Sequence, residues 1–143
     1  MGESLRGRIL DPHELTATEV PARAVVPGAL VSSADDVAKF LAALLAGEIV
    51  GESSLPEMLT TVPSDWEESQ GYGLGIERVD SLMGLERSPC GGAWGHVGLG
   101  ATTTVAFATP DAQRQVVLMA NAMLTSEAAW AALSRATWAV LCP

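Results

Sequence analysis

Apolar side chains recur at helical spacing in two parts of the chain, and each repeat predicts a helix with one buried face. The first helix covers about residues 34–46, where Ser33 can cap the first turn and Gly47 is placed to end the last one. The second covers about residues 126–141, and a shorter helix is expected near residues 55–61. The apolar positions are Val37, Phe40, Leu41, Leu44 and Leu45 in the first helix and Trp130, Leu133, Trp138 and Leu141 in the second.

Alternation with a period of two indicates strands in the second half of the chain. Residues 71–79 place large and small residues in turn, which predicts a strand with glycine on one face and a close neighbour against that face. Residues 93–110 are interpreted as one strand that breaks at its glycines and resumes. A turn at Pro110 and a further strand over residues 114–121 make residues 93–121 a predicted hairpin. Trp130 and Trp138 are expected to pack on this sheet.

These elements predict three successive regions of a single domain. Residues 1–30 contain three prolines and little periodicity, so they are expected to be an extended lead-in. Residues 31–62 form a helical part, and residues 71–143 hold the strands and the C-terminal helix. About three antiparallel strands with helices before and after them make an α+β fold.

Composition and charge limit the partners of the chain. The 143 residues are 48% hydrophobic and 17% charged, which is typical of a packed globular protein. A formal net charge of −9 disfavours binding to nucleic acid and to anionic membranes. No apolar run approaches the roughly 20 residues of a membrane-spanning helix. The first residues carry arginines with no apolar stretch behind them, so no secretory signal is predicted and the chain as written is expected to stay in the cytoplasm.

Common nucleophile motifs are absent from the sequence. The one lysine, Lys39, has Asp36 three positions before it, which excludes Ser-x-x-Lys. Tyr-x-Asn, Ser-x-Asn, Gly-x-Ser-x-Gly and a phosphate-binding glycine loop with a lysine are absent as well. With His13 and His96 as the only histidines, no metal site is predicted and no cofactor is expected.

Cys90 and Cys142 allow two interpretations. A bridge between them would tie the C-terminal helix to the loop before residue 93. Closing a loop of about 52 residues would contribute roughly 4 kcal/mol of stability, and the bridge would persist only in an oxidising compartment. Two unpaired thiols are the alternative, and the sequence alone does not distinguish the two.

Three short stretches occur in a fixed order along the chain. They are residues 27–40, Pro-Gly-Ala-Leu-Val-Ser-Ser-Ala-Asp-Asp-Val-Ala-Lys-Phe, residues 71–75, Gly-Tyr-Gly-Leu-Gly, and residues 94–98, Trp-Gly-His-Val-Gly. Together they resemble the C-terminal half of serine β-lactamase-related hydrolases, which include class C β-lactamases, D-Ala-D-Ala carboxypeptidases and related esterases. The resemblance implies a partial β-lactamase/DD-peptidase-like fold, in which a sheet flanked by helices lies beside a helical region with the active site between them.

The resemblance also implies roles for one short segment. In the family, Ser-x-x-Lys and Tyr-x-Asn lie upstream, and a Lys-Thr-Gly or His-Thr-Gly strand forms the third wall of the site. His96, Val97 and Gly98 match that strand by position. The backbone N–H of Leu99 would be an oxyanion donor, and Val97 and Gly100 would line the substrate. Family members that process peptide carboxylates often carry threonine where Val97 stands, and valine has no hydroxyl for that carboxylate.

Two hypotheses for function follow. In the first, the chain is the C-terminal portion of a secreted or extracytoplasmic serine hydrolase, acts on a small-molecule or peptide-like acyl substrate, and is inactive alone because it lacks the nucleophile. In the second, it is a stand-alone, non-catalytic module that binds a ligand or partner, with His96 as part of a binding groove. A purely structural histidine, hydrogen-bonded in a strand, is a separate alternative for His96. In both cases a sheet without its N-terminal strands leaves an open edge, so self-association is expected.

Overall fold

The structure, a computed structural model, describes residues 2–21, 30–64 and 69–143. In these ranges five strands form one antiparallel sheet in the order β1-β2-β3-β4-β5. The strands are β1 (Ser69–Tyr72), β2 (Glu77–Val79), β3 (Ala93–Leu99), β4 (Thr103–Ala108) and β5 (Gln115–Ala120). The helices are α1 (Gly2–Leu5), the π-helical η1 (Arg6–Leu10), α2 (Ala34–Leu45), α3 (Ser54–Met58) and α4 (Glu127–Leu141). The predicted α+β fold is confirmed, with five strands in place of about three.

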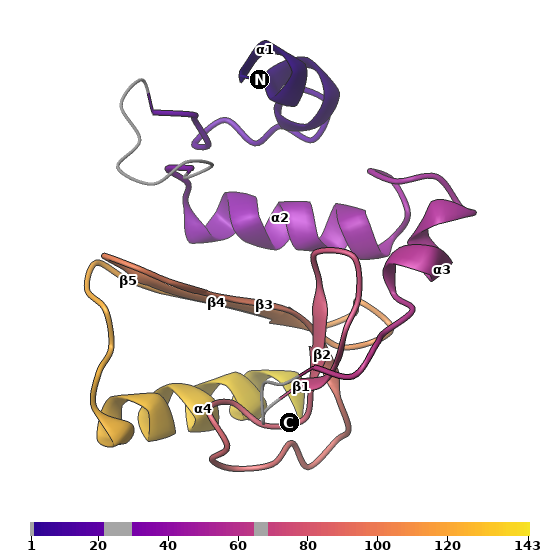
Figure 1. The fold of residues 1–143 in the computed structure, drawn as a ribbon. Coiled ribbons are helices and arrows are strands. Elements are labelled where there is room, and N and C mark those ends of the chain that lie inside the picture. Colours follow the sequence, from indigo (N-terminus) through magenta and orange to yellow (C-terminus); the bar gives the residue numbers. More distant parts are fainter. Residues whose placement is uncertain (1, 22–29, 65–68) are drawn as a thin grey trace.

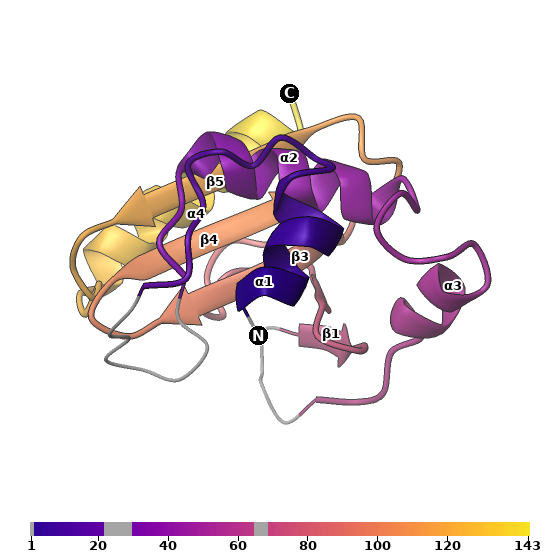
Figure 2. The same cartoon turned by 90° about the horizontal axis from the view of Figure 1, so that it is seen from above.

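The sheet lies between two helices, α2 on one face and α4 on the other (Figure 1). Helix α2 contacts β4 and β5, and α4 contacts β5 from the opposite face. Helices α1 and η1 lie beyond α2, on its side away from the sheet (Figure 1). Figure 2 shows α2 crossing above the strands, with α3 beside the end of the sheet that holds β1. The predicted helices over residues 34–46 and 126–141 therefore form the two layers that flank the sheet.

The start of α2 is fixed by a buried carboxylate. The Ser33 hydroxyl accepts a hydrogen bond from the Asp36 N–H, which confirms the predicted cap. The Asp36 side chain is buried and accepts from the backbone N–H of Ala17 at 2.8 Å and from the Thr18 hydroxyl at 2.7 Å. Because a buried carboxylate is costly without such partners, these bonds tie the segment before residue 21 to α2.

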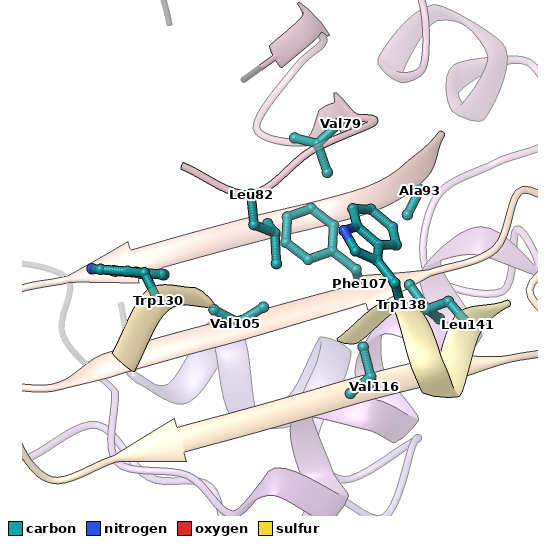
Figure 3. Packing of buried hydrophobic residues seen from close by; sticks show 9 residues of the cluster. All are labelled: Val79, Leu82, Ala93, Val105, Phe107, Val116, Trp130, Trp138 and Leu141. Atoms are coloured by element: carbon teal, nitrogen blue, oxygen red, sulfur yellow. The ribbon is translucent and has the colours of Figure 1, made fainter. Parts of the chain in front are cut away.

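A cluster of nine buried apolar residues holds α4 against the sheet (Figure 3). Phe107 of β4 lies at its centre and is fully buried, and Trp130 and Trp138 of α4 pack on the same sheet face, as predicted. The indole N–H of Trp130 donates to the Leu124 carbonyl, and that of Trp138 donates to the Glu86 carbonyl. Each buried ring therefore keeps a polar partner. The nine residues are Val79, Leu82, Ala93, Val105, Phe107, Val116, Trp130, Trp138 and Leu141.

Two predicted strands are each divided in the structure. Residues 71–79 form parts of β1 and β2, joined by a turn in which the Gly73 N–H donates to the Ile76 carbonyl and Gly75 has a positive φ of 77°. Residues 93–110 form β3 and β4, and the chain reverses between Leu99 and Thr103. Glycine thus marks reversals of the chain, and the predicted hairpin over residues 93–121 is a three-stranded meander.

Residues 1–30 also differ from the extended lead-in that their prolines suggest. Residues 2–10 are helical, and Leu10 and Leu15 are buried beneath this segment. A short bridge between Glu19 and Val31 closes the described part of the region. Residues 22–29, which include Pro27 and the first residues of the stretch 27–40, lie outside the described residues.

Cys90 and Cys142 are joined by a disulfide, with their Cα atoms 5.5 Å apart. The bridge links the residue after α4 to the loop that enters β3. Of the two alternatives that the sequence leaves open, the bonded one is present. The β3 entry and the C-terminal end of α4 are consequently fixed to each other.

Candidate active site

Strand β3 carries the predicted site residues His96 and Val97 on opposite faces of the sheet. Ala93 belongs to the cluster under α4, and Val97 packs against that cluster. Trp94 packs instead against Leu41 and Leu44 of α2. Because side chains alternate between the two faces of a strand, His96 lies on the same face as Trp94.

His96 is held by hydrogen bonds at both ring nitrogens. Its Nδ1 lies 2.8 Å from the Val97 carbonyl oxygen, and its Nε2 lies 2.6 Å from the Tyr72 hydroxyl. A carbonyl oxygen only accepts, so Nδ1 carries a proton and donates it to Val97, whereas the Tyr72 hydroxyl is able to donate to Nε2 or to accept from it. The two rings meet edge to face, with centroids 5.6 Å apart and planes at 85°. Both ring nitrogens therefore have a partner within the protein, and the orientation of the imidazole is fixed.

Tyr72 also belongs to this site, although the sequence alone suggests no role for it. It comes from β1, whereas His96 comes from β3, and β2 lies between these strands. Its signal in the sequence is modest: it is the one tyrosine in the chain, and it lies between two glycines of the stretch 71–75. Gly73 allows the chain to pass the Met58 backbone carbonyl, where a Cβ would collide. Close packing of this turn thus places Tyr72 beside His96.

The segment after His96 is open to solvent. Gly98 and Gly100 are exposed, and Leu99 is 52% exposed. A Cβ on Gly98 would meet only the Thr104 residue, at 3.7 Å, and a Cβ on Gly100 would meet nothing within 4 Å. Gly95 is different, because a Cβ there would overlap the Ala106 backbone carbonyl. The structure therefore requires glycine for chain packing at Gly95 alone among these three positions.

Lys39 lies on the exposed side of α2 and forms an ion pair. Its ammonium is 2.8 Å from the Asp35 carboxylate, one turn earlier on the helix. The hydrogen bond and the charge of Asp35 raise the pKa of Lys39 above its usual value. An amine that keeps its proton more firmly is a poor general base. The one lysine of the chain therefore has neither the sequence spacing nor the protonation state of a Ser-x-x-Lys base.

A cavity of about 530 Å³ lies between the N-terminal helices, the start of α2 and the sheet. Apolar residues such as Ile9, Val37 and Phe40 form most of its wall. Asp36 and Thr104 add polar groups, and Thr104 pairs with Gly98 across β3 and β4. The cavity therefore opens on the same sheet face as His96.

Residues 2–21, 30–64 and 69–143 contain neither a cluster of metal-binding side chains nor a membrane-spanning helix. No three His, Cys, Asp or Glu side chains there come together in a way that would hold a metal ion. None of the helices in these ranges has both the length and the apolar character needed to cross a bilayer.

Solved structures with the same fold include two amide hydrolases. A D-stereospecific amidohydrolase from Streptomyces sp. matches with a TM-score of 0.74 and 24% identity, over 99% of this chain and 48% of that protein. A D-amino acid amidase from Ochrobactrum anthropi SV3 matches with a TM-score of 0.67 and 20% identity, over 87% of this chain and 45% of that protein. At these identities the matches establish the fold. The chain spans about half the length of the solved structures that it matches.

The model of one protein family, described as Beta-lactamase, matches residues 1–137. This range includes all five strands and both helices that cover the sheet, apart from the last turn of α4. It also includes the three stretches on which the resemblance to β-lactamase-related hydrolases is based. The chain belongs to the beta-lactamase family.

Proposed function

We propose that this chain forms one wall of the active site of a serine hydrolase that cleaves amides or esters by acyl transfer. The observation that carries the proposal is the His96–Tyr72 pair beside the exposed segment of Gly98, Leu99 and Gly100. In this proposal Leu99 supplies a backbone N–H to the oxyanion. Gly98 leaves space for the reacting acyl group, and the backbone of Val97 and Gly100 lines the substrate, because the Val97 side chain packs toward α4.

The oxyanion role follows from the chemistry of acyl transfer. Attack on a carbonyl builds negative charge on its oxygen, and a fixed N–H donor stabilises that charge without having to reorganise. One such donor is worth about 3 kcal/mol in the transition state. With Nδ1 bonded to the Val97 carbonyl and Nε2 bonded to the Tyr72 hydroxyl, His96 has no free N–H in this arrangement. We therefore assign oxyanion binding to Leu99 and the placement of its strand to His96.

Val97 and the two solved neighbours support an amide as the substrate class. Valine has no hydroxyl to bind a substrate carboxylate, and its side chain packs against the cluster under α4, which argues against a carboxypeptidase. The neighbours are named as a D-stereospecific amidohydrolase and a D-amino acid amidase. A small amino acid amide needs no carboxylate partner, so it fits the segment better than a peptide with a free C-terminus.

The nucleophile of the proposed reaction lies outside these 143 residues. The chain has no Ser-x-x-Lys motif, and it covers 48% of the Streptomyces amidohydrolase. We expect the isolated chain to be inactive and to remain unlabelled by a fluorophosphonate or a β-lactam, as read by intact mass against an active serine hydrolase treated in parallel. A stable adduct on one of its serines would contradict the missing nucleophile.

The mass of the native protein, measured in the organism that produces it, tests the same proposal. An antibody to this region should detect a species much heavier than 14.8 kDa, and that species should carry Ser-x-x-Lys and Tyr-x-Asn. The disulfide further supports an oxidising, extracytoplasmic compartment in place of the cytoplasm. A native species of 14.8 kDa would contradict the hydrolase proposal.

The alternative function is a non-catalytic module that binds a ligand or a partner. The largely apolar cavity of about 530 Å³ supports it, because ligand sites are commonly apolar cavities with a few polar groups. A native species of 14.8 kDa with no labelling by either reagent would favour this module over the hydrolase.

A further inference from the structure

The Cys90–Cys142 bridge presents its two sulfurs differently to solvent. Cys90 is exposed on the loop that enters β3, whereas Cys142 is half-buried and caps the C-terminal end of α4, where its N–H donates to the Trp138 carbonyl at 2.8 Å. Thiol–disulfide exchange begins when a thiolate attacks one sulfur of a bridge, and the rate depends on access to that sulfur. An incoming thiol therefore reaches Cys90 more readily, which leaves Cys142 as the departing sulfur.

Ser88 places a hydroxyl group against both sulfurs. Its Oγ lies 3.4 Å from Cys142 Sγ and 3.7 Å from Cys90 Sγ. A sulfur in a disulfide carries no proton, so the hydroxyl is the donor in either contact. Cys142 would depart as a thiolate at the C-terminal end of a helix, where negative charge is disfavoured. A hydrogen bond from Ser88 to this thiolate would offset part of that cost.

Contacts that do not involve the bridge keep the loop beside α4. The Trp138 indole N–H donates to the Glu86 carbonyl at 3.0 Å, and Leu141, the last residue of α4, is buried in the cluster under that helix. The Ser88 N–H donates to the Asp80 carbonyl at 2.6 Å, which fixes the backbone that carries the hydroxyl group. The two sulfurs therefore remain close when the S–S bond opens, and the bond can form again.

We propose that Cys90 is a site of reversible modification by low-molecular-weight thiols, that Cys142 is the sulfur that departs and later restores the bridge, and that Ser88 is the positioning residue that donates to it. The exchange is independent of the proposed hydrolase activity. While Cys90 carries the small thiol, the covalent link between α4 and the entry of β3 is open.

The exchange conserves atoms and electrons. In the forward step, the thiolate of the small thiol forms a bond to Cys90 Sγ, the S–S bond breaks, and its electron pair stays on Cys142 Sγ. The products are a mixed disulfide at Cys90 and a Cys142 thiolate. In the reverse step, this thiolate attacks Cys90 Sγ, the small thiol departs as a thiolate, and the bridge is restored. No external oxidant is required.

Trapping of the mixed disulfide tests which sulfur is attacked. The folded chain is incubated with mercaptoethanol, quenched with N-ethylmaleimide and mapped by peptide mass spectrometry. The main singly reacted species should carry mercaptoethanol on Cys90 and N-ethylmaleimide on Cys142. The opposite arrangement as the main species, or a bridge that opens only in concentrated urea, would overturn the inference.

Variants of Ser88 test the donor. Ser88→Ala should slow the opening of the bridge in the folded chain by at least about threefold, because a hydrogen bond to a charged group is lost as the thiolate departs. Ser88→Thr keeps the hydroxyl and should open at close to the unaltered rate. In concentrated urea all three chains should react equally fast, because the contact with the sulfurs exists only in the folded chain.

Urea unfolding of the oxidised variants confirms that each one is folded under the conditions of the rate measurement. Equal rates for Ser88→Ala and the unaltered folded chain would overturn the role of Ser88. A Ser88→Thr variant as slow as Ser88→Ala would overturn it as well, because the hydroxyl would then not be the group that acts.

Discussion

The hydroxyl of Tyr72 lies 2.6 Å from Nε2 of His96, and this contact joins two sequence motifs that are 24 residues apart. Tyr72 belongs to Gly-Tyr-Gly-Leu-Gly and His96 to Trp-Gly-His-Val-Gly. Glu77 lies between them, paired with Tyr72 on one side and with Gly95 on the other. The two motifs thus build one structure, in which β1 fixes a side chain of β3 across the intervening strand.

Replacing Tyr72 with phenylalanine should remove the partner of His96 Nε2 while keeping the aromatic ring. The lost hydrogen bond should lower the free energy of unfolding by about 1 kcal/mol and change the environment of Nε2, whereas Nδ1 keeps its bond to the Val97 carbonyl. The ¹⁵N chemical shifts of the His96 ring report the environment of Nε2, and urea unfolding reports the stability. In a His96→Ala background the Tyr72→Phe change should cost much less. Equal costs in the two backgrounds would show that the pair is not coupled.

Gly95 and Gly98 should respond in opposite ways to alanine. A Cβ on Gly95 would overlap the Ala106 carbonyl and meet the Phe107 ring, so Gly95→Ala should lower the free energy of unfolding by about 2 kcal/mol or more. Gly98→Ala places its Cβ 3.7 Å from Thr104, an ordinary contact, and should change stability by about 1 kcal/mol or less. Urea unfolding compares the two variants, and a Gly95→Ala variant as stable as Gly98→Ala would be inconsistent with this packing.

The helices and their caps were accessible from the sequence because local spacing determines them. The apolar positions of residues 34–46 and 126–141 define one buried face each, and the Ser33 cap depends on residues within one turn. The final strand, predicted at residues 114–121, agrees with β5 within about one residue. Residues 2–10 were not recognised as helical, because their short turns are held by contacts with the rest of the fold and not by periodicity.

The number of strands and the geometry of the site could not be predicted from local spacing in the sequence. A glycine within an alternating pattern fits a bulge, a close approach or a reversal equally well, and tertiary pairing decides among them. Gly75 and Gly100 lie in reversals, whereas Gly95 lies within β3. The Tyr72–His96 contact depends on the β1–β2 turn, so a prediction of one continuous strand over residues 71–79 could not place it.

Removing the disulfide should weaken the link between α4 and the entry of β3. The bridge closes a sequence separation of 52 residues, so Cys90→Ser/Cys142→Ser should lower the free energy of unfolding by about 2–4 kcal/mol, mainly by freeing the unfolded chain. Urea unfolding in oxidising buffer makes the measurement. In reducing buffer the double variant and the unaltered chain should agree. Equal stability in oxidising buffer would contradict the stabilising role of the bridge.

Asp111 should contribute a pH dependence at the turn between β4 and β5. The Thr109 hydroxyl and the Gln113 N–H donate to its carboxylate, at 2.5 Å and 3.1 Å, and they hold the pKa of Asp111 below its usual value. A group with a lowered folded pKa stabilises the fold fully above its unfolded pKa, about 4, and loses that contribution as the pH falls through the folded pKa. The stabilisation is therefore lost on the acid side.

Thr109→Val should reduce this acid sensitivity. Urea unfolding at several pH values between about 5 and 2 should show a shallower loss of stability in the variant than in the unaltered chain. In an Asp111→Asn background the Thr109→Val change should leave the pH dependence unaltered, because the titrating group is gone. Parallel pH curves for the unaltered chain and Thr109→Val would contradict the assignment.

Strand β5 should promote the self-association that the sequence predicts. It pairs with β4 alone in the described sheet, whereas β1 at the other end is bridged by Val62 to Tyr72. Its six residues include neither a charge nor a proline, the two features that commonly protect an edge strand. Met119 is 40% exposed, so Met119→Lys should shift the chain toward monomer in sedimentation velocity at high concentration. Leu74→Lys, at the exposed β1–β2 turn, serves as the control and should not change the association. A chain that stays monomeric at every concentration, or one that responds equally to both lysines, would rule out pairing through β5.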